Sequence, residues 1–347
     1  MNELKAICEA FAENRGGGQR LVLATVVRTS GSVYRRPGAR MLVRLDANGE
    51  CSMTGAISGG CLERDVCESA REVLRGGASV VVKYDTTSDD DIVWGLGLGC
   101  DGSVEVLLEP LAPRVHPESP PSTVETHPVA FLARCLERRE RGVMATVIET
   151  RGATGAHVGT RLLLNAGREE ASDITDGELL QSVREDVRAA MREGRSSVRG
   201  YDLHAGHAGV FIETIEPPVP LVVFGAGADA VPVARLAREL GWFVTVVDHR
   251  AAYATTARFP EAHELVVCRP EHVAERVRLD ARTVTLVMTH NYEHDRAIIK
   301  TLLESPARYV GCLGPKRRTE KLLTELRDLD EGFAPTGEQL ARVYAPV

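Results

Sequence analysis

The sequence lacks the signals of several large classes of protein. No apolar run approaches the roughly 18 residues that span a bilayer, and the N-terminal segment has acidic residues within its apolar stretch, unlike a signal peptide. Basic residues are in deficit, because 42 Lys and Arg stand against 49 Asp and Glu, a formal charge of −7. A nucleic-acid binder needs a basic footprint. We therefore expect a cytoplasmic protein without a membrane span that binds no nucleic acid.

The motifs of common catalytic and metal sites are also missing. The eight cysteines form no Cys-x-x-Cys pair, which argues against zinc ribbons and thioredoxin-type sites. In a reducing cytoplasm they are expected to be thiols. The sequence contains no His-Glu-x-x-His segment, no Walker A loop and no Ser-His-Asp signature. It offers no residue set for turnover of a small substrate, which favours a protein that is not an enzyme.

Two proline-rich stretches divide the 347 residues. The stretch 110–128 holds six prolines, a density that predicts an extended linker, and 217–220 reads Pro-Pro-Val-Pro. We predict an α/β protein with an N-terminal two-lobed domain over 1–217. A Rossmann-like, doubly wound parallel sheet is predicted for 221–347.

The N-terminal domain contains an internal repeat over 21–110 and 143–217. Residues 24–43 align with 145–164 without a gap, and eight of these 20 positions are identical. Each copy then has a helix-like segment, a strand that ends in Tyr-Asp and a closing strand that ends in Glu-Pro. The shared order predicts two α/β lobes that arose by duplication.

The two copies differ at a glycine-rich turn. The first has Gly59-Gly60-Cys61-x-Glu63 at the predicted start of its helix, and the second has neither the thiol nor the double glycine. A helix N-terminus lowers the pKa of a thiol, and Glu63 is either a partner acid or a favourable N-terminal charge. Cys100 lies in a second glycine-dense stretch of the first copy. Because thiolates suit sulfur chemistry or a soft metal, we predict a site at Cys61 and Cys100.

Arginines cluster near this turn in an otherwise acidic chain. Arg28 and Arg40 flank the segment 29–38, and such a cluster suits an anionic ligand such as a phosphate. Arg40 recurs in the second copy as Arg161, so a structural role also stays open for it.

The C-terminal domain carries a nucleotide-binding pattern. An apolar strand leads into Gly225-x-Gly227-x-x-Ala230 and a helix, and the next strand ends at Asp248. In this pattern the glycines permit a tight turn and the approach of a pyrophosphate. The small residue allows close packing, and the acid accepts from a ribose hydroxyl. Asp229 would repel a phosphate at this turn, so dinucleotide binding stays open.

Further polar groups follow other strands of this domain. Ligands of such sheets bind beyond the carboxyl ends of the strands, and the candidates there are His249, Thr289, His290, Lys316 and Arg317. The basic pair either grips a phosphate or forms a solvated helix face.

Together these segments resemble the XdhC/CoxI family, over nearly the whole chain. The matching stretches are VVRTSGSVYRRPGARMLV, GAISGGCLERDV, GLGCDGSVEVLLEPL, FGAGADAVPVARLA, THNYEHD and YVGCLGPKRR. Asp101 and Pro315 depart from the family pattern, in which a glycine and a serine are usual.

The resemblance implies an accessory protein for molybdenum hydroxylases such as xanthine dehydrogenase and carbon monoxide dehydrogenase. Such a protein carries molybdenum cofactor, assists or protects its sulfuration with a cysteine desulfurase, and delivers it to the apo-enzyme. It is typically a homodimer. Carried over by residue, Cys61 and its neighbours Gly59, Gly60 and Glu63 contact the cofactor, and Cys61 and Cys100 are the contacts to its molybdenum.

Two alternatives stay open on the sequence. One is an NAD(P)-dependent oxidoreductase, in which the turn Gly225–Ala230 and Asp248 hold the nucleotide and His290 is the acid or base. The other is a structural or regulatory adaptor, in which Cys61→Ala costs nothing beyond stability.

Overall fold

The structure is a computed structural model that describes residues 2–14, 19–85, 102–111, 126–166, 170–329 and 333–346. The chain divides into an N-terminal unit, Glu3–Pro217, and a C-terminal unit that begins at Pro218. No helix in the described ranges is long and apolar enough to cross a membrane. Cys100 and Asp101 lie outside these ranges.

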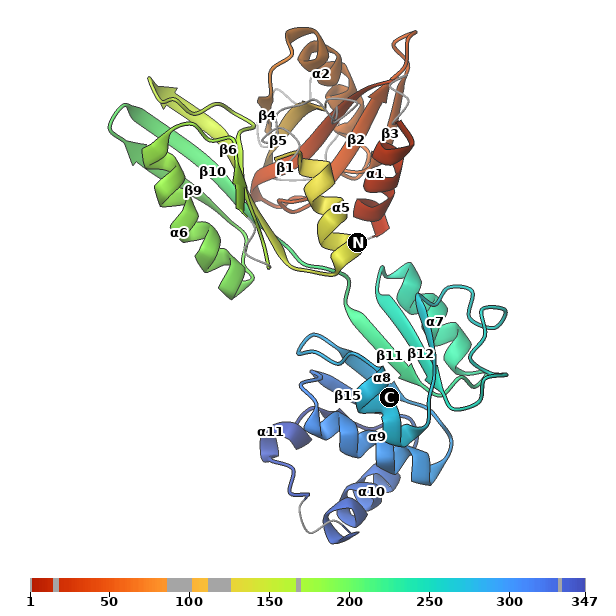
Figure 1. Ribbon diagram of the computed structural model, residues 1–347. Coiled ribbons are helices and arrows are strands. Elements are labelled where there is room, and N and C mark those ends of the chain that lie inside the picture. Colours follow the sequence, from red (N-terminus) through yellow and green to blue (C-terminus); the bar gives the residue numbers. More distant parts are fainter. Residues whose placement is uncertain are drawn as a thin grey trace. The chain divides into compact units, whose positions relative to one another are not determined.

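The N-terminal unit holds two antiparallel five-stranded sheets of the same topology (Figure 1). In each lobe the third strand lies at one edge, followed by the second, first, fifth and fourth. The first sheet consists of β1 (Arg20–Gly31), β2 (Arg40–Leu45), β3 (Cys51–Gly55), β4 (Val80–Asp85) and β5 (Gly102–Leu111). The second consists of β6 (Gly142–Gly152), β7 (Arg161–Asn165), β8 (Glu170–Ser172), β9 (Ser197–Leu203) and β10 (Gly206–Ile215).

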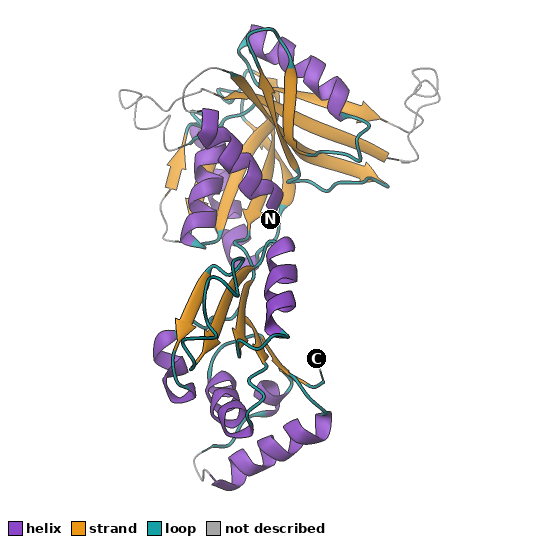
Figure 2. Cartoon of the chain, turned by 90° about the vertical axis from the view of Figure 1, so that its right-hand side faces the viewer, coloured by secondary structure: helices purple, strands orange, loops and turns teal. Residues whose placement is uncertain are grey.

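Each sheet is covered on one face by an amphipathic helix (Figure 2). Helix α2 (Glu63–Gly76) packs on the first sheet and α6 (Gly177–Glu193) on the second. Their buried residues recur every three or four positions, which places them on one side of the helix. Helices α1 (Asn2–Glu13) and α5 (Pro128–Arg138) were not predicted, and they bury apolar residues against the opposite faces.

The two lobes meet through equivalent residues. The register of β1 skips Val27 and that of β6 skips Ile148, so each strand has a β-bulge at the same position of the repeat. Val27 and Ile148 form one buried cluster with Leu107 and Phe211. The faces turned away from α2 and α6 are therefore covered in part by the sister lobe.

Two buried ion pairs connect the lobes reciprocally. Arg40 of the first lobe donates to Glu213 of the second, with 2.7 Å between Nη1 and Oε1, and Arg161 of the second donates to Glu109 of the first. Strand register pairs Glu109 with Leu23 and Glu213 with Met144. Glu109 is therefore equivalent to Glu213, and the match of the two Glu-Pro strand ends, which paired Glu109 with Glu216, was wrong.

The proline-rich stretch starts and ends within regular elements. Pro110 lies in β5 opposite Val22, beyond Leu108, where the pairing of β4 with β5 ends. A proline fits there because β5 has a neighbour on only one side. Pro128 is the first residue of α5, and the His127 side chain accepts from the Ala130 amide. Residues 112–125 are not among those described.

One pair of cysteines differs from the expectation that all are thiols. A disulfide joins Cys51 of β3 to Cys67 of α2, 16 residues further along the chain. Both residues contact the apolar core between the first sheet and α2. The bond connects an edge strand to the helix that follows the Cys61 turn.

The C-terminal unit is built on a six-stranded parallel sheet in the order β13-β12-β11-β14-β15-β16. This order reverses beside the first strand, as in doubly wound dinucleotide-binding folds. The predicted α/β class with a Rossmann-like sheet is confirmed. The strands are β11 (Pro220–Phe224), β12 (Phe243–Asp248), β13 (Glu264–Val267), β14 (Val284–Val287), β15 (Tyr309–Cys312) and β16 (Val343–Tyr344). The helices are α7 (Ala230–Glu239), the 3-10 turn Pro270–His272, α8 (Val273–Arg276), α9 (Tyr292–Glu304), α10 (Lys316–Leu329) and α11 (Gly337–Leu340).

Candidate functional site

The turn that carries Cys61 is held by two side chains that the turn itself supplies. The Ser58 hydroxyl accepts from the amides of Gly60 and Leu62, both at 3.1 Å. Glu63 accepts from the amides of Ile57 and Ser58, at 3.3 and 2.9 Å, and from the Ser58 hydroxyl. These contacts replace a side-chain cap on α2 and fix the turn.

The Glu63 carboxylate therefore serves the turn. Burial alone would raise the pKa of Glu63, but hydrogen bonds from the Ser58 hydroxyl and from backbone amides lower it below its ordinary value. Both oxygens are engaged by the turn, which fits a role in positioning Cys61 better than one as a partner acid.

Cys61 lies on the open side of this turn. The thiol is half-buried against the core beneath α2, and it precedes the helix, which begins at Glu63. Gly59 and Gly60 before it are exposed. Gly60 has φ +109°, and a Cβ there would meet no atom within 4 Å. The turn thus leaves room for a ligand beside the thiol.

Neither predicted arginine is available as a simple anion contact. Arg28 donates to Glu105 at 2.9 and 3.1 Å and lies 3.6 Å from Glu149 of the second lobe. Arg40 is buried and paired with Glu213. Burial would lower the pKa of Arg40, but the Glu213 carboxylate raises it above its ordinary value. The sequence left two roles for Arg40, anion binding and a structural role. Its burial and its pairing with Glu213 fit the structural role.

Cys100, the second predicted thiol, lies outside the described residues, so its position relative to Cys61 stays a prediction. Among the residues that the structure does describe, no three His, Cys, Asp or Glu side chains are grouped as ligands of a metal ion.

The Rossmann turn of the C-terminal unit follows β11. Gly225 has φ +109°, and a Cβ there would lie 2.6 Å from the Met288 carbonyl carbon and 2.9 Å from Thr289 Cα. Only glycine fits this approach of two backbones. Ala230 is fully buried at the start of α7. The backbone thus has the shape of a dinucleotide turn.

The acid at the end of β12 is already occupied. Asp248 has a side-chain exposure of 2%, and it accepts from Arg250 at 2.8 to 2.9 Å and from the Ala226 amide at 2.7 Å. Burial would raise the pKa of Asp248, but these bonds lower it to about 2. A ribose hydroxyl would have to displace Arg250 to reach this carboxylate.

The mouth of the turn is crossed by a second pair. The Asp229 carboxylate lies against Gly227, where an added Cβ would overlap it, and it contacts His290 Nε2 at 2.7 Å. This carboxylate occupies the place where the pattern puts a pyrophosphate. The arrangement does not fit a dinucleotide, although dinucleotide binding itself stays a prediction.

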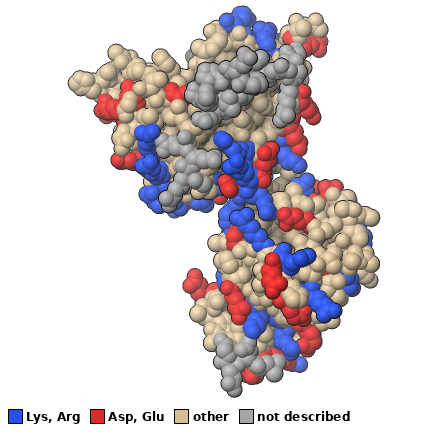
Figure 3. Space-filling view, viewed as in Figure 1, with Lys and Arg blue, Asp and Glu red and all other residues tan. Residues whose placement is uncertain are grey.

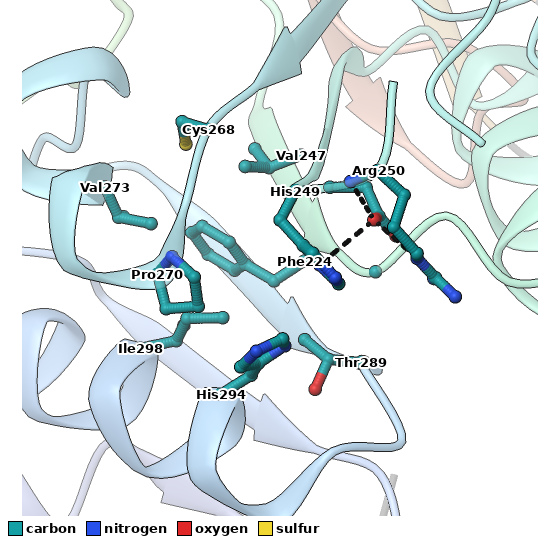
Figure 4. Close-up of a pocket in the computed structure, with 12 residues that line it drawn as sticks. Phe224, Val247, His249, Arg250, Cys268, Pro270, Val273, Thr289, His294 and Ile298 are labelled. Carbon is teal, nitrogen blue, oxygen red and sulfur yellow. Dashed lines mark hydrogen bonds and ion pairs between the residues drawn. The ribbon is translucent and has the colours of Figure 1, made fainter. Parts of the chain in front are cut away.

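A pocket opens beside this turn, at the carboxyl ends of β11, β12 and β14 (Figure 4). Pro270, Val273 and Ile298 line one side, and Arg250 and Thr289 lie on the other. The rings of His249 and His294 meet edge to face within it, 4.5 Å apart. Four predicted residues, Gly225, Asp248, His249 and Thr289, therefore share one pocket.

The basic residues at the start of α10 lie in different surroundings. Lys316 and Arg317 are exposed to solvent. Of the two roles considered for this pair, their exposure fits a solvated helix face. Arg318 instead lines a second pocket and pairs with buried Asp295 at 2.7 Å. The Thr289 hydroxyl donates to the same carboxylate. Across the face drawn in Figure 3, acidic and basic side chains are interspersed.

Comparisons with known proteins bear on both units. The XdhC and CoxI family matches residues 15–85 and 135–202, and the XdhC Rossmann domain matches 221–347. A Bacillus subtilis (strain 168) protein whose name describes it as a probable xanthine dehydrogenase subunit is 30% identical to this chain, over 97% of this chain and 91% of its own length.

Two further likenesses cover different shares of the chain. A crystal structure described as a xanthine dehydrogenase from Bacillus halodurans has a TM-score of 0.73 and 27% identity, covering 99% of this chain and 88% of that one. The uncharacterized protein YqeB of Escherichia coli (strain K12) is 28% identical over 59% of this chain and 39% of its own.

Proposed function

Because the chain belongs to the XdhC and CoxI family, we propose that it is an accessory protein of a xanthine dehydrogenase-type molybdenum hydroxylase. It binds molybdenum cofactor as cargo and holds it while a cysteine desulfurase supplies the terminal sulfur. It then delivers the cofactor to the apo-enzyme. The names of its relatives from Bacillus subtilis and Bacillus halodurans support a partner of this type.

The observation that carries the proposal is the half-buried thiol of the first lobe, which follows two exposed glycines. Cys61 is presented beside an exposed double glycine on a turn fixed by Ser58 and Glu63. The duplicated second lobe keeps the sheet and the helix but has Glu178 at the equivalent position. A fold that preserves its framework twice and its thiol once has retained that thiol for chemistry rather than for packing.

The residues present suit such a cargo in two respects. A thiolate is a soft ligand and matches molybdenum and sulfur. The missing side chain at Gly60, where a Cβ would meet no atom within 4 Å, lets a large ligand approach the backbone. For the pterin phosphate, the exposed Arg36 is a better candidate than Arg40, which is buried.

The proposal is tested by binding of released molybdenum cofactor to the purified protein. After gel filtration, the fluorescence of the oxidised pterin measures what is bound to the wild type, Cys61→Ser and Cys268→Ser. Cys268 is a half-buried thiol of the C-terminal unit and serves as the matched control. We expect near-stoichiometric binding that Cys61→Ser removes and Cys268→Ser retains. Absence of binding by folded wild type would refute the carrier function.

The oxidoreductase alternative receives less support from the C-terminal unit. It requires a dinucleotide at the turn after β11, and there Asp229 pairs with His290 while Asp248 pairs with Arg250. Homodimer formation remains a prediction, which light scattering of the purified protein would check.

A further inference from the structure

The two lobes of the N-terminal unit differ most where Cys61 lies. Aligned on their buried isoleucines, α2 begins six residues after Ile57, whereas α6 begins three residues after Ile174. In the second lobe Asp176 is the N-cap, and its side chain accepts from the Leu179 amide at 3.0 Å. Gly59 stands at the same position of the first lobe and has no side chain to cap with. The first turn of the helix is therefore unwound, which leaves Gly60 and Cys61 in an open loop.

A second loop lies against this position in both lobes. In the second lobe it is tied down by polar contacts, because the Thr175 hydroxyl donates to the Gly155 carbonyl at 2.8 Å and the Gly155 amide faces Asp176 at 3.4 Å. The residue equivalent to Gly155 in the gapless alignment is Tyr34. Its ring lies over Gly59, with ring atoms 3.6 to 3.8 Å from where a Cβ would be. The same two loops meet in each lobe, but only the first places an aromatic ring there.

Tyr34 is the most exposed large hydrophobic side chain among the described residues, at 71%. Gly59 covers one face of the ring, so the other face is free to contact a flat ligand. Neighbouring Arg35 pairs with Glu3, which anchors the loop beside the ring. The ring is thus held in place while much of its surface stays open.

We infer that the face of Tyr34 turned away from Gly59 forms a stacking site for the planar pyrimidinone ring of the cargo, beside Gly60 and Cys61. This inference rests on the proposed carrier function and adds the residue that orients the ligand. The flat ring stacks on the outer face of Tyr34, whose other face rests on Gly59, and the soft atom of the ligand faces the thiol. Stacking on an aromatic side chain tolerates any flat ring, so the contact supplies affinity and orientation rather than fine selectivity.

The inference is tested with two probes on the full chain. Released molybdenum cofactor reports the whole site, and a metal-free oxidised pterin reports the ring contact alone through quenching of its fluorescence. The variants are Tyr34→Ala, Tyr34→Phe and Cys61→Ala. His157→Ala is the matched control, because His157 is exposed in the equivalent loop of the second lobe.

We expect Tyr34→Ala to weaken binding of both probes about tenfold, and Tyr34→Phe to stay within about twofold of wild type because it keeps the ring. His157→Ala should match wild type. Cys61→Ala should remove binding of the cofactor but spare quenching of the metal-free pterin. Thermal melting checks that each variant is folded. We expect the Tyr34 variants to fold, because this side chain is exposed.

The outcomes separate this inference from the carrier function. If Tyr34→Ala binds both probes like wild type while Cys61→Ala fails to bind cofactor, the stacking site is wrong and the carrier function stands. If wild type binds the pterin through Tyr34 but not the cofactor, the stacking site stands and the carrier function is wrong. If neither probe binds, both are wrong.

Discussion

The two glycines of the Rossmann turn carry different constraints, although the motif treats them alike. Gly225 combines a positive φ with backbone atoms at 2.6 and 2.9 Å from a Cβ, so Gly225→Ala forces the backbone to move. We expect this variant to lose about 2 kcal/mol of unfolding free energy. At Gly227 the obstructing atom belongs to the Asp229 side chain, which can rotate away. Gly227→Ala should lose less than about 1 kcal/mol, and equal losses in urea unfolding would contradict this difference.

The charge of Asp229 is expected to exclude dinucleotides from the turn. A carboxylate about 4 Å from a phosphate costs between about 1 and 4 kcal/mol, depending on the local dielectric. Asp229→Asn keeps the size of the side chain and removes its charge, so we expect NADH to bind at least about fivefold more tightly than to wild type. Fluorescence titration measures the affinity.

The chain offers a matched control for this charge removal. Asp202 also contacts a histidine, His207, at 2.8 Å, but lies in the N-terminal unit. Asp202→Asn should leave NADH affinity unchanged. Tight binding of NADH to the wild type, unaffected by Asp229→Asn, would show that the turn accepts a pyrophosphate.

The role of a residue could be predicted only where the residues that it contacts are close to it in the sequence. The glycine turn follows from a strand, a spacing and a helix, all within 221–248. The partners that decide availability are distant, as for Arg40 with Glu213 or Asp229 with His290. No spacing rule connects residues 173 or 61 positions apart. The sequence therefore indicates which residues are chemically suited, and the structure shows which are already engaged.

At the scale of elements, the connection between β3 and α2 depends on one carboxylate. Glu63 has a lowered pKa in the folded protein, so its contribution to stability is present above its unfolded pKa of about 4.3 and is lost as pH falls through the folded value. We expect Glu63→Gln to lower stability by about 1 kcal/mol at pH 7, because charge-assisted bonds to a half-exposed turn are modest. The difference from wild type should shrink as the pH falls below the unfolded pKa of about 4.3 and vanish once the folded carboxyl group is protonated.

Thermal unfolding at pH 7 and pH 3 measures this difference. Glu68→Gln is the control, since Glu68 is exposed on the same helix. A difference between Glu63→Gln and wild type that is as large at pH 3 as at pH 7 would mean that the turn is held by something other than the ionised carboxylate.

The elements themselves were predictable where periodicity is strong. Helices α2 and α6 begin and end within about two residues of the segments 62–75 and 179–192 that the sequence predicts as helices, and the gapless repeat predicted two lobes with the same order of elements. Helices α1 and α5 were not predicted. Neither the comparison of the N-terminal segment with a signal peptide nor the density of prolines before residue 128 reveals an amphipathic helix. The late start of α2 follows from Gly59 replacing a capping residue, a difference that only comparison with the second lobe makes visible.

At the scale of the whole N-terminal unit, the reciprocal Arg–Glu pairs hold the duplicated lobes together. Removing one partner leaves a buried charge uncompensated, so Glu213→Gln should cost about 3 kcal/mol or more. The double variant Arg40→Met/Glu213→Leu should cost less than Glu213→Gln, since neither charge remains. Denaturant unfolding measures this, and Glu9→Gln, from the exposed Lys5–Glu9 pair, should change stability by less than about 1 kcal/mol. A double variant that is as unstable as Glu213→Gln, or more so, would contradict the coupling.

The division of the chain into two units gives a test of where the proposed cargo binds. Each apolar cluster of the described residues belongs to one unit. The clusters formed by buried residues between Ile7 and Ile215 lie in the N-terminal unit, and those between Leu221 and Phe333 lie in the C-terminal unit. A unit with its own core can in principle fold alone. We therefore expect the fragment 1–217 to fold and to bind molybdenum cofactor like the full chain, and 218–347 to fold without binding it. Cys61→Ala in the fragment should abolish binding. A folded fragment 1–217 that does not bind would mean that the cofactor also needs groups of the Rossmann unit, and the pocket around His249 and His294 would be the first place to substitute.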